Sequence, residues 1–239
     1  MPLQAERILR TFRYAMYFDG VDDYVEVSNN FALYDLMNWT VMAWVAPFFV
    51  AAPGFYPQIF HPLPGGEMSL VPYAEGVHLT DGNWYGTSTY TGPSMVFTHV
   101  AGGRYNGTSL LLYVNGNLVE TASIPDYDLV NPSGYCSSIG ATNSCGNDQF
   151  FTGYIYNVLV YNFALSQSQI QYNMMVPDNP IREGLLLWLQ ADPAYISGST
   201  WYDLSGNNNN GTIYGATLVE LTPSHARQLQ AERVLSPVR

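Results

Sequence analysis

The chain contains no lysine, and only 11% of its 239 residues are charged, against about 25% in an ordinary soluble domain. No apolar run approaches the roughly 18 residues of a membrane-spanning helix, so membrane insertion is not expected. Cys136 and Cys145 lack the C-x-x-C spacing of a metal or redox site. A disulfide closing a short loop and two free thiols both stay open for this pair.

All eight cations are arginines, and six of them lie at the two ends of the chain. Residues 14–226 carry only two arginines against 17 of the 19 acids, so the body is strongly acidic. Such a body repels phosphate, which argues against a nucleic-acid partner. Acidic body and basic ends instead favour attraction between copies of the chain. The arginines expected in such contacts are Arg7, Arg10, Arg227 and Arg233.

The two ends also share sequence. Residues 3–9 read LQAERIL and residues 229–235 read LQAERVL, with six of seven positions identical. Either two amphipathic segments resemble each other by chance, or the chain is one unit of a repeat almost as long as itself.

The composition of the body is typical of a protein outside the cell. Charges are few, Tyr, Asn, Gly and Thr are frequent, and N-x-S/T sequons occur at Asn38, Asn106 and Asn210. No signal peptide is visible, because residues 1–13 contain three arginines and no continuous apolar stretch. The composition and the sequons together predict an extracellular location, and a virion surface is a route that needs no visible signal peptide.

Short apolar or alternating runs, separated by Gly, Pro and Asn, predict an almost all-β fold. Asn115–Gly116 predicts a type I′ hairpin turn, since both central residues of that turn need a positive φ. One helix is predicted over residues 166–174, where Ser166 and Gln169 make a capping box. The predicted strands cover residues 14–18, 23–27, 39–49, 95–102, 109–114, 136–141, 151–161 and 184–192.

Four runs together resemble the laminin-G-like, or concanavalin-A-like, jelly-roll family. They are FDGVDDYVEV (18–27), WTVMAWVAPF (39–48), FTHVAGGRYNGTSLLLYVNGNLV (97–119) and GYIYNVLVYNFALSQSQI (153–170). The resemblance implies an all-β, two-sheet antiparallel jelly-roll sandwich with one short helix. It places Phe18, Val25, Trp44, Val100, Leu112, Val114, Ile155 and Val158 on the inner faces.

One motif stands out of order. GLLLWLQAD and WYDLSGNNNNGTIYGA, within residues 184–216, match a pattern that precedes FDGVDDYV in the family, yet here they follow everything else. This segment either folds back onto its own body or completes a neighbouring copy by strand complementation. A head-to-tail contact of the second kind would build a ring or a fibre.

The expected organisation has a jelly roll flanked by basic extensions. Pro177 and Pro180 bar a helix, which indicates a linker after the jelly roll. The parts are a basic N-terminal extension (1–13), a jelly roll (14–175), a linker (176–183), strands completing the same or a neighbouring jelly roll (184–221), and a basic C-terminal extension (222–239).

The sequence gives no support for an enzyme. Retaining glucanases of this fold carry an E-x-D-x-x-E strand that sets two acids about 5–5.5 Å apart, and no such string occurs. The four histidines show no spacing typical of a triad or a zinc site. We interpret His99, in the strand FTHVAG, as structural.

The resemblance implies calcium, held by Asp side chains and carbonyls, with Asp19, Asp22 and Asp148 as the candidate ligands. The family pattern IDEVRIY reads here Ile155 to Tyr161 with Tyr156 in place of an acid, which weakens the match to a calcium site. Surface glycans are the second class of partner considered. The aromatic residues Trp84, Tyr85 and Tyr90 could stack on sugar rings or on a neighbouring subunit.

Leu159 and Phe163 stand where the family often has arginine, and apolar side chains facing outward are expected to be covered by a partner. The assembly interface predicted on this basis comprises Leu159, Phe163, Leu185, Leu187 and Trp188, together with the terminal arginines. The leading hypothesis is a non-enzymatic structural protein that assembles into a homo-oligomer, filament, coat or virion appendage. The alternative is a calcium-dependent, carbohydrate-binding adhesive module.

Overall fold

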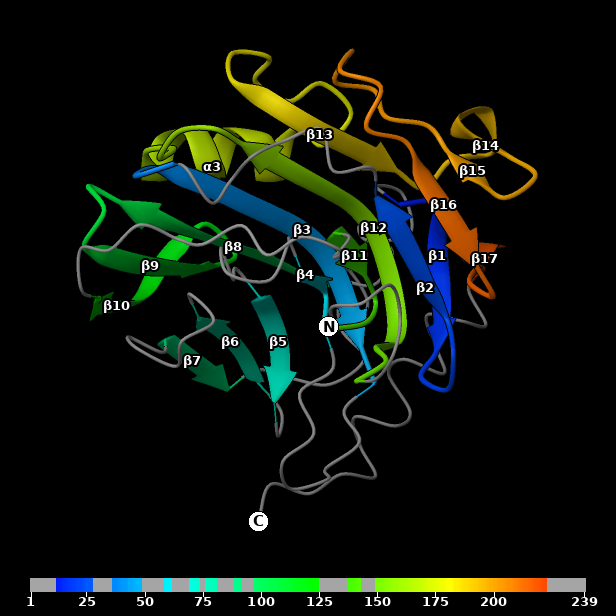
Figure 1. Cartoon of the computed structure of the whole chain (residues 1–239), viewed down its shortest axis with the longest axis horizontal. Coiled ribbons are helices and arrows are strands. Elements are labelled where there is room, and N and C mark those ends of the chain that lie inside the picture. Colours follow the sequence, from blue (N-terminus) through cyan, green and yellow to red (C-terminus); the bar gives the residue numbers. More distant parts are fainter. Residues whose placement is uncertain are drawn as a thin grey trace.

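The computed structural model describes residues 12–27, 36–48, 58–61, 69–73, 76–80, 88–91, 97–124, 137–142 and 149–222. Strands dominate this part of the chain, and they form two antiparallel sheets. One short α-helix accompanies them (Figure 1). The predicted two-sheet sandwich is therefore confirmed. Within the described residues, no helix combines the length and the apolar character needed to cross a membrane.

The first sheet, called sheet A, contains eight of the described strands. Seven of them follow one another in space, and β13 pairs with the free part of β12's edge beside β1. In spatial order they are β10 (Asn117–Ser123), β9 (Ser109–Val114), β8 (Thr98–Tyr105), β3 (Trp39–Pro47), β12 (Thr152–Tyr161), β1 (Tyr14–Asp19) and β17 (Thr217–Glu220), with β13 (Leu185–Gln190).

The second sheet, sheet B, contains nine described strands. The 3-10 turn η2 (Pro193–Tyr195) leads directly into β14, the strand at one edge of this sheet. The order is β14 (Ile196–Ser197), β15 (Thr200–Trp201), β16 (Gly211–Tyr214), β2 (Tyr24–Val27), β11 (Ser137–Ile139), β4 (Phe60–His61), β5 (Ser69–Tyr73), β6 (Gly76–Thr80) and β7 (Ser88–Thr91).

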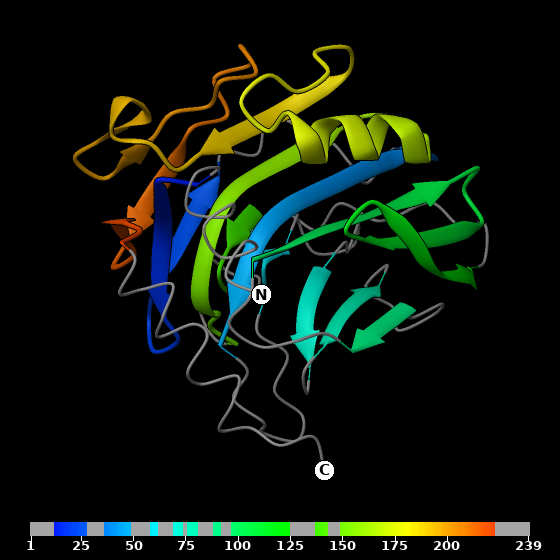
Figure 2. The ribbon, with the colours of Figure 1, turned by 180° about the vertical axis from the view of Figure 1, so that it is seen from behind.

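The C-terminal strands complete the sheets of their own chain. β13 pairs with β12, β16 with β2, and β17 with β1, all antiparallel. Figures 1 and 2 show the orange strands β16 and β17 beside the blue strands β2 and β1. The displaced motif of residues 184–216 thus folds back onto its own body, and no strand from another copy is needed to fill these positions.

The core between the sheets follows the alternation of the strands. Seven of the eight residues expected on the inner faces are buried: Phe18, Val25, Val100, Leu112, Val114, Ile155 and Val158. Trp44 is the exception. Its neighbours Ala43 and Val45 are buried in the core, so alternation turns Trp44 to the opposite face. There its ring lies 5.0 Å from that of Phe12 and 5.3 Å from that of His99.

The predicted hairpin and helix are both present. Asn115 and Gly116 have φ values of 50° and 74°, as a type I′ turn requires. Helix α3 (Gln167–Met175) starts after Ser166, with both hydrogen bonds of the capping box formed. The side-chain amides of Gln167 and Gln171 each donate to Gly116 O at 3.0 Å, which fixes the helix on the hairpin.

A second apolar cluster covers the outer face of sheet A. Ile170 of α3, Leu165 before the helix, and Ile181 and Leu204 from two connecting segments pack over it. The face itself contributes Met42, Ala101, Tyr113, Leu159, Tyr161, Leu185 and Trp188. Figures 1 and 2 show α3 lying along the ends of β3 and β12.

This cluster corrects the predicted assembly interface. Leu159, Leu185 and Trp188 are buried beneath their own chain, and Trp188 is only 5% exposed. Leu187 lies in the core between the sheets, while Phe163 is half-buried against Tyr161. A buried side chain cannot contact another subunit, so the covering partner expected for these residues is the chain itself.

The outer edge of β13 is occupied by polar side chains of residues 203–209. Asp203 accepts hydrogen bonds from the backbone N–H groups of Trp188, Ser205 and Asn209 at 2.9, 2.9 and 3.0 Å. The amide of Asn207 donates to Leu185 O at 2.9 Å, and Leu204 N donates to Trp188 O at 2.8 Å. A free strand edge invites pairing with another chain, and these contacts block it here.

We expect Asp203→Ala to lower the free energy of unfolding by about 3 kcal/mol, because it leaves several part-buried N–H groups without an acceptor. Asp192→Ala is the matched control, since within the described residues that carboxylate accepts one hydrogen bond, from Ala194 N, and its loss should cost about 1 kcal/mol. Urea denaturation of both variants measures the difference. Equal losses would contradict the role given to Asp203.

His99 is a buried, neutral histidine. It is 2% exposed, and burial lowers the pKa of its imidazole from 6.5 to about 3. The unfolded chain takes up a proton near pH 6.5 and the folded chain does not, so stability falls as the pH drops below 6.5. This agrees with the structural role expected for His99.

The stability lost at His99 between pH 7 and pH 5 should be about 2 kcal/mol. A His99→Leu variant should lose correspondingly less over the same interval, because leucine takes up no proton. Denaturant unfolding at pH 5, 7 and 8 tests this, with the interval from pH 7 to 8 as the control in which both proteins behave alike. Identical acid sensitivity of the two proteins would show that His99 does not titrate as stated.

Candidate functional site

Only part of the predicted site set falls within the described residues. Asp19 and Asp22 are described, whereas Asp148 is not. Among the aromatic residues, Trp84, Tyr85 and the side chain of Tyr90 lie outside the described part, although the backbone of Tyr90 belongs to β7. The terminal arginines Arg7, Arg10, Arg227 and Arg233, and both cysteines, also lie outside it.

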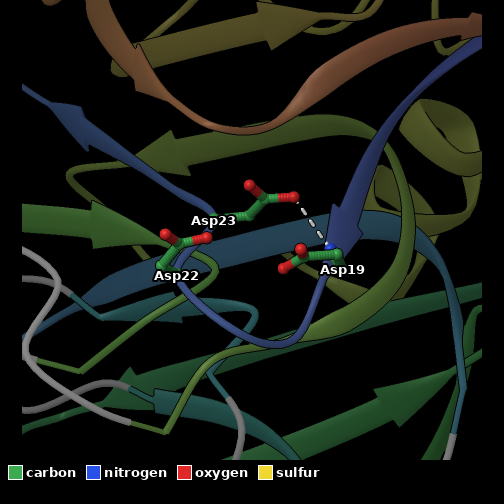
Figure 3. Close-up of side chains that lie close together, drawn as sticks. All are labelled: Asp19, Asp22 and Asp23. Carbon is green, nitrogen blue, oxygen red and sulfur yellow. Dashed lines mark hydrogen bonds between the residues drawn. The ribbon is translucent and has the colours of Figure 1, made fainter.

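The structure brings three aspartates together in the loop that joins β1 to β2. Asp19 ends β1, and Asp22 and Asp23 precede β2, so the loop crosses from sheet A to sheet B at the rim of the sandwich. One carboxylate oxygen of each residue lies within 4.8 Å of the others. Figure 3 shows the three side chains around this turn. We call Asp19 to Asp23 the acidic loop.

Asp23 is the member that the sequence interpretation missed. It was assigned to the following strand, DYVEV, whose alternating pattern includes it. The signal available in the sequence was the density of acids, three within the five residues DGVDD. Chain geometry makes the difference, because the turn at Gly20 reverses the backbone and brings residue 23 beside residue 19.

Hydrogen bonds hold the acidic loop in this shape. Asp19 N donates to Asp23 Oδ2 at 2.8 Å, which Figure 3 marks, and Val21 N donates to Asp19 Oδ1 at 2.8 Å. Gly20 has a φ of +82°, a backbone conformation that residues other than glycine rarely adopt. A Cβ on Gly215 would lie 2.0 Å from Asp23 Oδ1, so glycine there leaves room for the carboxylate.

The electrostatics of the acidic loop favour a cation. Asp23 is 6% exposed, and burial raises the pKa of its carboxyl. The hydrogen bond from Asp19 N acts in the opposite direction, and the charges of Asp19 and Asp22 raise this pKa further. The arginines of the described residues are engaged elsewhere: Arg13 with Glu220, Arg104 with Gly107 O, and Arg182 over Trp188.

The donor set is chemically suited to calcium. Ca²⁺ prefers carboxylate and carbonyl oxygens and takes six to eight of them, with water supplying the remainder. The acidic loop offers three carboxylates from three residues, of which Asp19 and Asp22 are exposed and reachable. Asp19, Asp22 and Asp23 are therefore the described residues that would hold the ion.

Tyr156, which stands in place of an expected acid, has a structural role. Its hydroxyl donates to Asp178 Oδ1 at 2.5 Å, and the Gln190 amide donates to the same oxygen at 3.0 Å. Burial and the neighbouring Asp178 raise the pKa of Tyr156. This phenol anchors the segment that connects α3 to β13.

Comparison with known families gives one match. The model of the concanavalin A-like lectin/glucanases superfamily matches residues 19–171, which is more than half of the chain. The match includes the acidic loop and ends within α3, before the displaced motif. Among curated proteins, no sequence matches this one.

Solved structures of the same fold are similar to this chain. A candidate carbohydrate-binding protein from Bacteroides ovatus aligns with a TM-score of 0.68 and 21% identity, over 88% of this chain and 60% of its own. Domain 4 of an extracellular arabinanase from Geobacillus stearothermophilus, in complex with arabinotriose, aligns with a TM-score of 0.50 and 19% identity, over 66% of this chain and 75% of its own. At these identities the likeness concerns the fold.

Calcium should raise the thermal midpoint of unfolding, because an ion that binds the folded state alone stabilises it. A concentration about 100-fold above the dissociation constant should give a shift of about 5 °C or more. Asp22→Asn should reduce the shift, since this exposed side chain can lose its charge without breaking a described hydrogen bond.

Glu183→Gln provides the control for the loss of one negative charge, because this exposed carboxylate is not in the acidic loop. It should keep the full shift, and Mg²⁺ should produce less of it than Ca²⁺ in the parent protein. A midpoint insensitive to calcium, or an equal loss in both variants, would exclude the acidic loop as a calcium site.

Proposed function

Because the chain belongs to the concanavalin A-like lectin/glucanases superfamily, we propose that it is a non-catalytic carbohydrate-binding module that binds glycans with calcium at its acidic loop. The observation that carries the proposal is the convergence of Asp19, Asp22 and Asp23 at the rim of the sandwich. A calcium ion held there would accept further oxygen ligands, and sugar hydroxyls are ligands of that kind.

The names of the similar structures support the same direction. One is a candidate carbohydrate-binding protein, and the other is a domain in complex with arabinotriose. This chain spans 60% of the Bacteroides ovatus chain, so the activity of that whole protein is not transferred. The two similar structures support only the class of ligand, a glycan.

The family description covers lectins and glucanases, and lectin-type binding fits this chain better than glucanase activity. The E-x-D-x-x-E string of retaining enzymes is absent from the sequence. The described acids that lie together belong to a loop and are suited to holding a cation. His99, which the sequence predicts to be structural, is buried and neutral.

Glycan binding also takes precedence over self-assembly. The strands expected to be donated pair within the chain, and most of the apolar residues expected at an interface are buried by it. The low charge and the sequons favour action outside the cell, where glycans are presented. A secreted or surface location is therefore part of the proposal.

A glycan array probed in the presence of calcium should give signals that EDTA abolishes and that added calcium restores. Asp22→Asn should weaken the same signals, and Glu183→Gln should leave them unchanged. Binding that persists in EDTA would remove calcium from the proposal and keep the glycan. The absence of signal on neutral and charged glycans alike would refute the function.

A further inference from the structure

The outward face of sheet B carries a pair of tyrosines beside the acidic loop. Val25 and Val27 of β2 lie in the core, so alternation turns Tyr24 and Glu26 outward. On the neighbouring strand β16, Tyr214 stands directly opposite Tyr24, and Thr212 directly opposite Glu26. These four residues form a small aromatic and polar patch.

The two tyrosine rings are stacked. Their centroids lie 4.5 Å apart with an interplanar angle of 9°. Tyr24 therefore covers one face of the Tyr214 ring. Tyr214 is nevertheless 41% exposed, and this exposure belongs to the face and edges that Tyr24 does not cover. A rigid aromatic surface of this kind, fixed by its partner ring, loses little side-chain entropy when a ligand stacks on it.

The space beside Tyr214 is bordered by a turn with little bulk. Ile213 N donates to Ser199 O at 2.7 Å, which places the β14–β15 turn next to the end of β16. Gly198 in that turn has no atom within 4 Å of the position where a Cβ would stand. Apart from the chain neighbours of Gly198, no described residue therefore fills the position of a side chain there.

Glu26 supplies a hydrogen-bond acceptor at the edge of the pair. Its Oε2 accepts from the Tyr214 hydroxyl at 3.4 Å, a long bond that leaves the carboxylate available to a stronger donor. Within the described part of the chain, the one ion pair joins Arg13 and Glu220, so Glu26 is not neutralised by a described cation. Thr212, exposed beside it, adds a hydroxyl.

Aromatic ring, carboxylate and hydroxyl together match the chemistry of a pyranose. The apolar C–H face of a sugar stacks on an aromatic ring, and its hydroxyls donate to carboxylates. The charges around the patch indicate whether a neutral or an acidic sugar fits there. Glu26 is negative, three acidic-loop carboxylates outnumber the two charges of a bound calcium ion, and all three arginines of the described residues are engaged elsewhere. A sialic acid or uronate would meet repulsion without an arginine to bind it.

We propose that Tyr214, backed by Tyr24 and flanked by Glu26 and Thr212, is a stacking subsite for an uncharged hexopyranose unit, and that the module accordingly prefers neutral over acidic glycans. The proposal rests on the glycan-binding function given above and deepens it.

The subsite lies next to the acidic loop along the chain. Asp23 directly precedes Tyr24, and Gly215 directly follows Tyr214. The close approach of Gly215 to Asp23 Oδ1 joins the ends of the two elements. The acidic loop and the tyrosine pair are therefore neighbours along both β2 and β16.

The test uses the full chain on an array that presents matched pairs, each neutral glycan beside its sialylated form, in the presence of calcium. The parent protein should bind neutral members at least about tenfold better than their sialylated partners. The neutral glycan with the highest signal is then titrated against the variants by isothermal calorimetry.

Tyr214→Ala should weaken this binding about tenfold, and Tyr214→Phe, which keeps the ring, by less than about threefold. Glu26→Gln should lie between them. Tyr172→Ala is the matched control, since Tyr172 is a comparably exposed tyrosine (44%) on α3, away from this face, and it should leave affinity unchanged. Thermal midpoints of all variants establish that they are folded.

The outcomes separate the two proposals. If the parent binds neutral glycans and Tyr214→Ala binds them equally well, the subsite is refuted and the glycan-binding function stands. Preference for the sialylated members refutes the charge argument, with the same consequence. If the parent binds no glycan of either kind, the function fails and the subsite fails with it. Should Tyr214→Ala unfold, unchanged affinity of Glu26→Gln or a preference for acidic glycans refutes the subsite, and weaker binding by Glu26→Gln together with a preference for neutral glycans supports it.

Discussion

Antiparallel pairing between the two ends of the described chain is the interaction on which the rest of the structure depends. β16 pairs with β2, and β17 pairs with β1, across about 190 to 200 residues of sequence. The first pairing sets Tyr214 against Tyr24 and brings Gly215 to Asp23. The stacked tyrosine pair and the close approach of Gly215 to Asp23 thus have a common origin in the backbone pairing of β2 with β16, while the acidic loop also has side-chain hydrogen bonds of its own.

The apolar cluster under α3 explains part of the low charge of the chain. A two-sheet sandwich with one solvated face per sheet needs polar side chains there. Here the outer face of sheet A is covered by the helix and by connecting segments, so positions such as Leu159 and Trp188 become interior. Apolar residues in outward register therefore reflect a third layer within the chain, and association between chains is not required to explain them.

Local signals predicted most of the fold. The Asn115–Gly116 turn, the capping box at Ser166 and the alternating strands depend on neighbouring residues, and a single sequence shows them. Sequence could not decide whether residues 184–216 pair in the same chain, because strand pairing has the same chemistry within and between molecules. The assignment of Leu159 and Trp188 to an interface failed for a related reason, since periodicity shows that a face is covered without showing what covers it.

The candidate site was half visible in the sequence. Asp19 and Asp22 carried the signal of acids around a glycine turn, while Asp23 was hidden in a strand pattern. The tyrosine pair gave no local signal at all. Tyr24 and Tyr214 are 190 positions apart, and only the register between β2 and β16 makes them neighbours. Recognition surfaces assembled across a sheet are in general invisible until the order of the strands is known.

The same pairing determines when the molecule can finish folding. On a ribosome, β1, β2 and β12 emerge before their C-terminal partners β17, β16 and β13, and the last of those partners, β17, ends at Glu220. Until β13 has emerged, part of the β12 edge is unpaired, and until β16 and β17 have emerged, one edge of β2 and one edge of β1 are unpaired, which makes the incomplete chain prone to aggregation. Non-local pairing of this kind also slows folding, because a large loop must close before its contacts form. A shortened product that ends before β13 would therefore contain the whole matched region, residues 19–171, and still have open edges in both of its sheets.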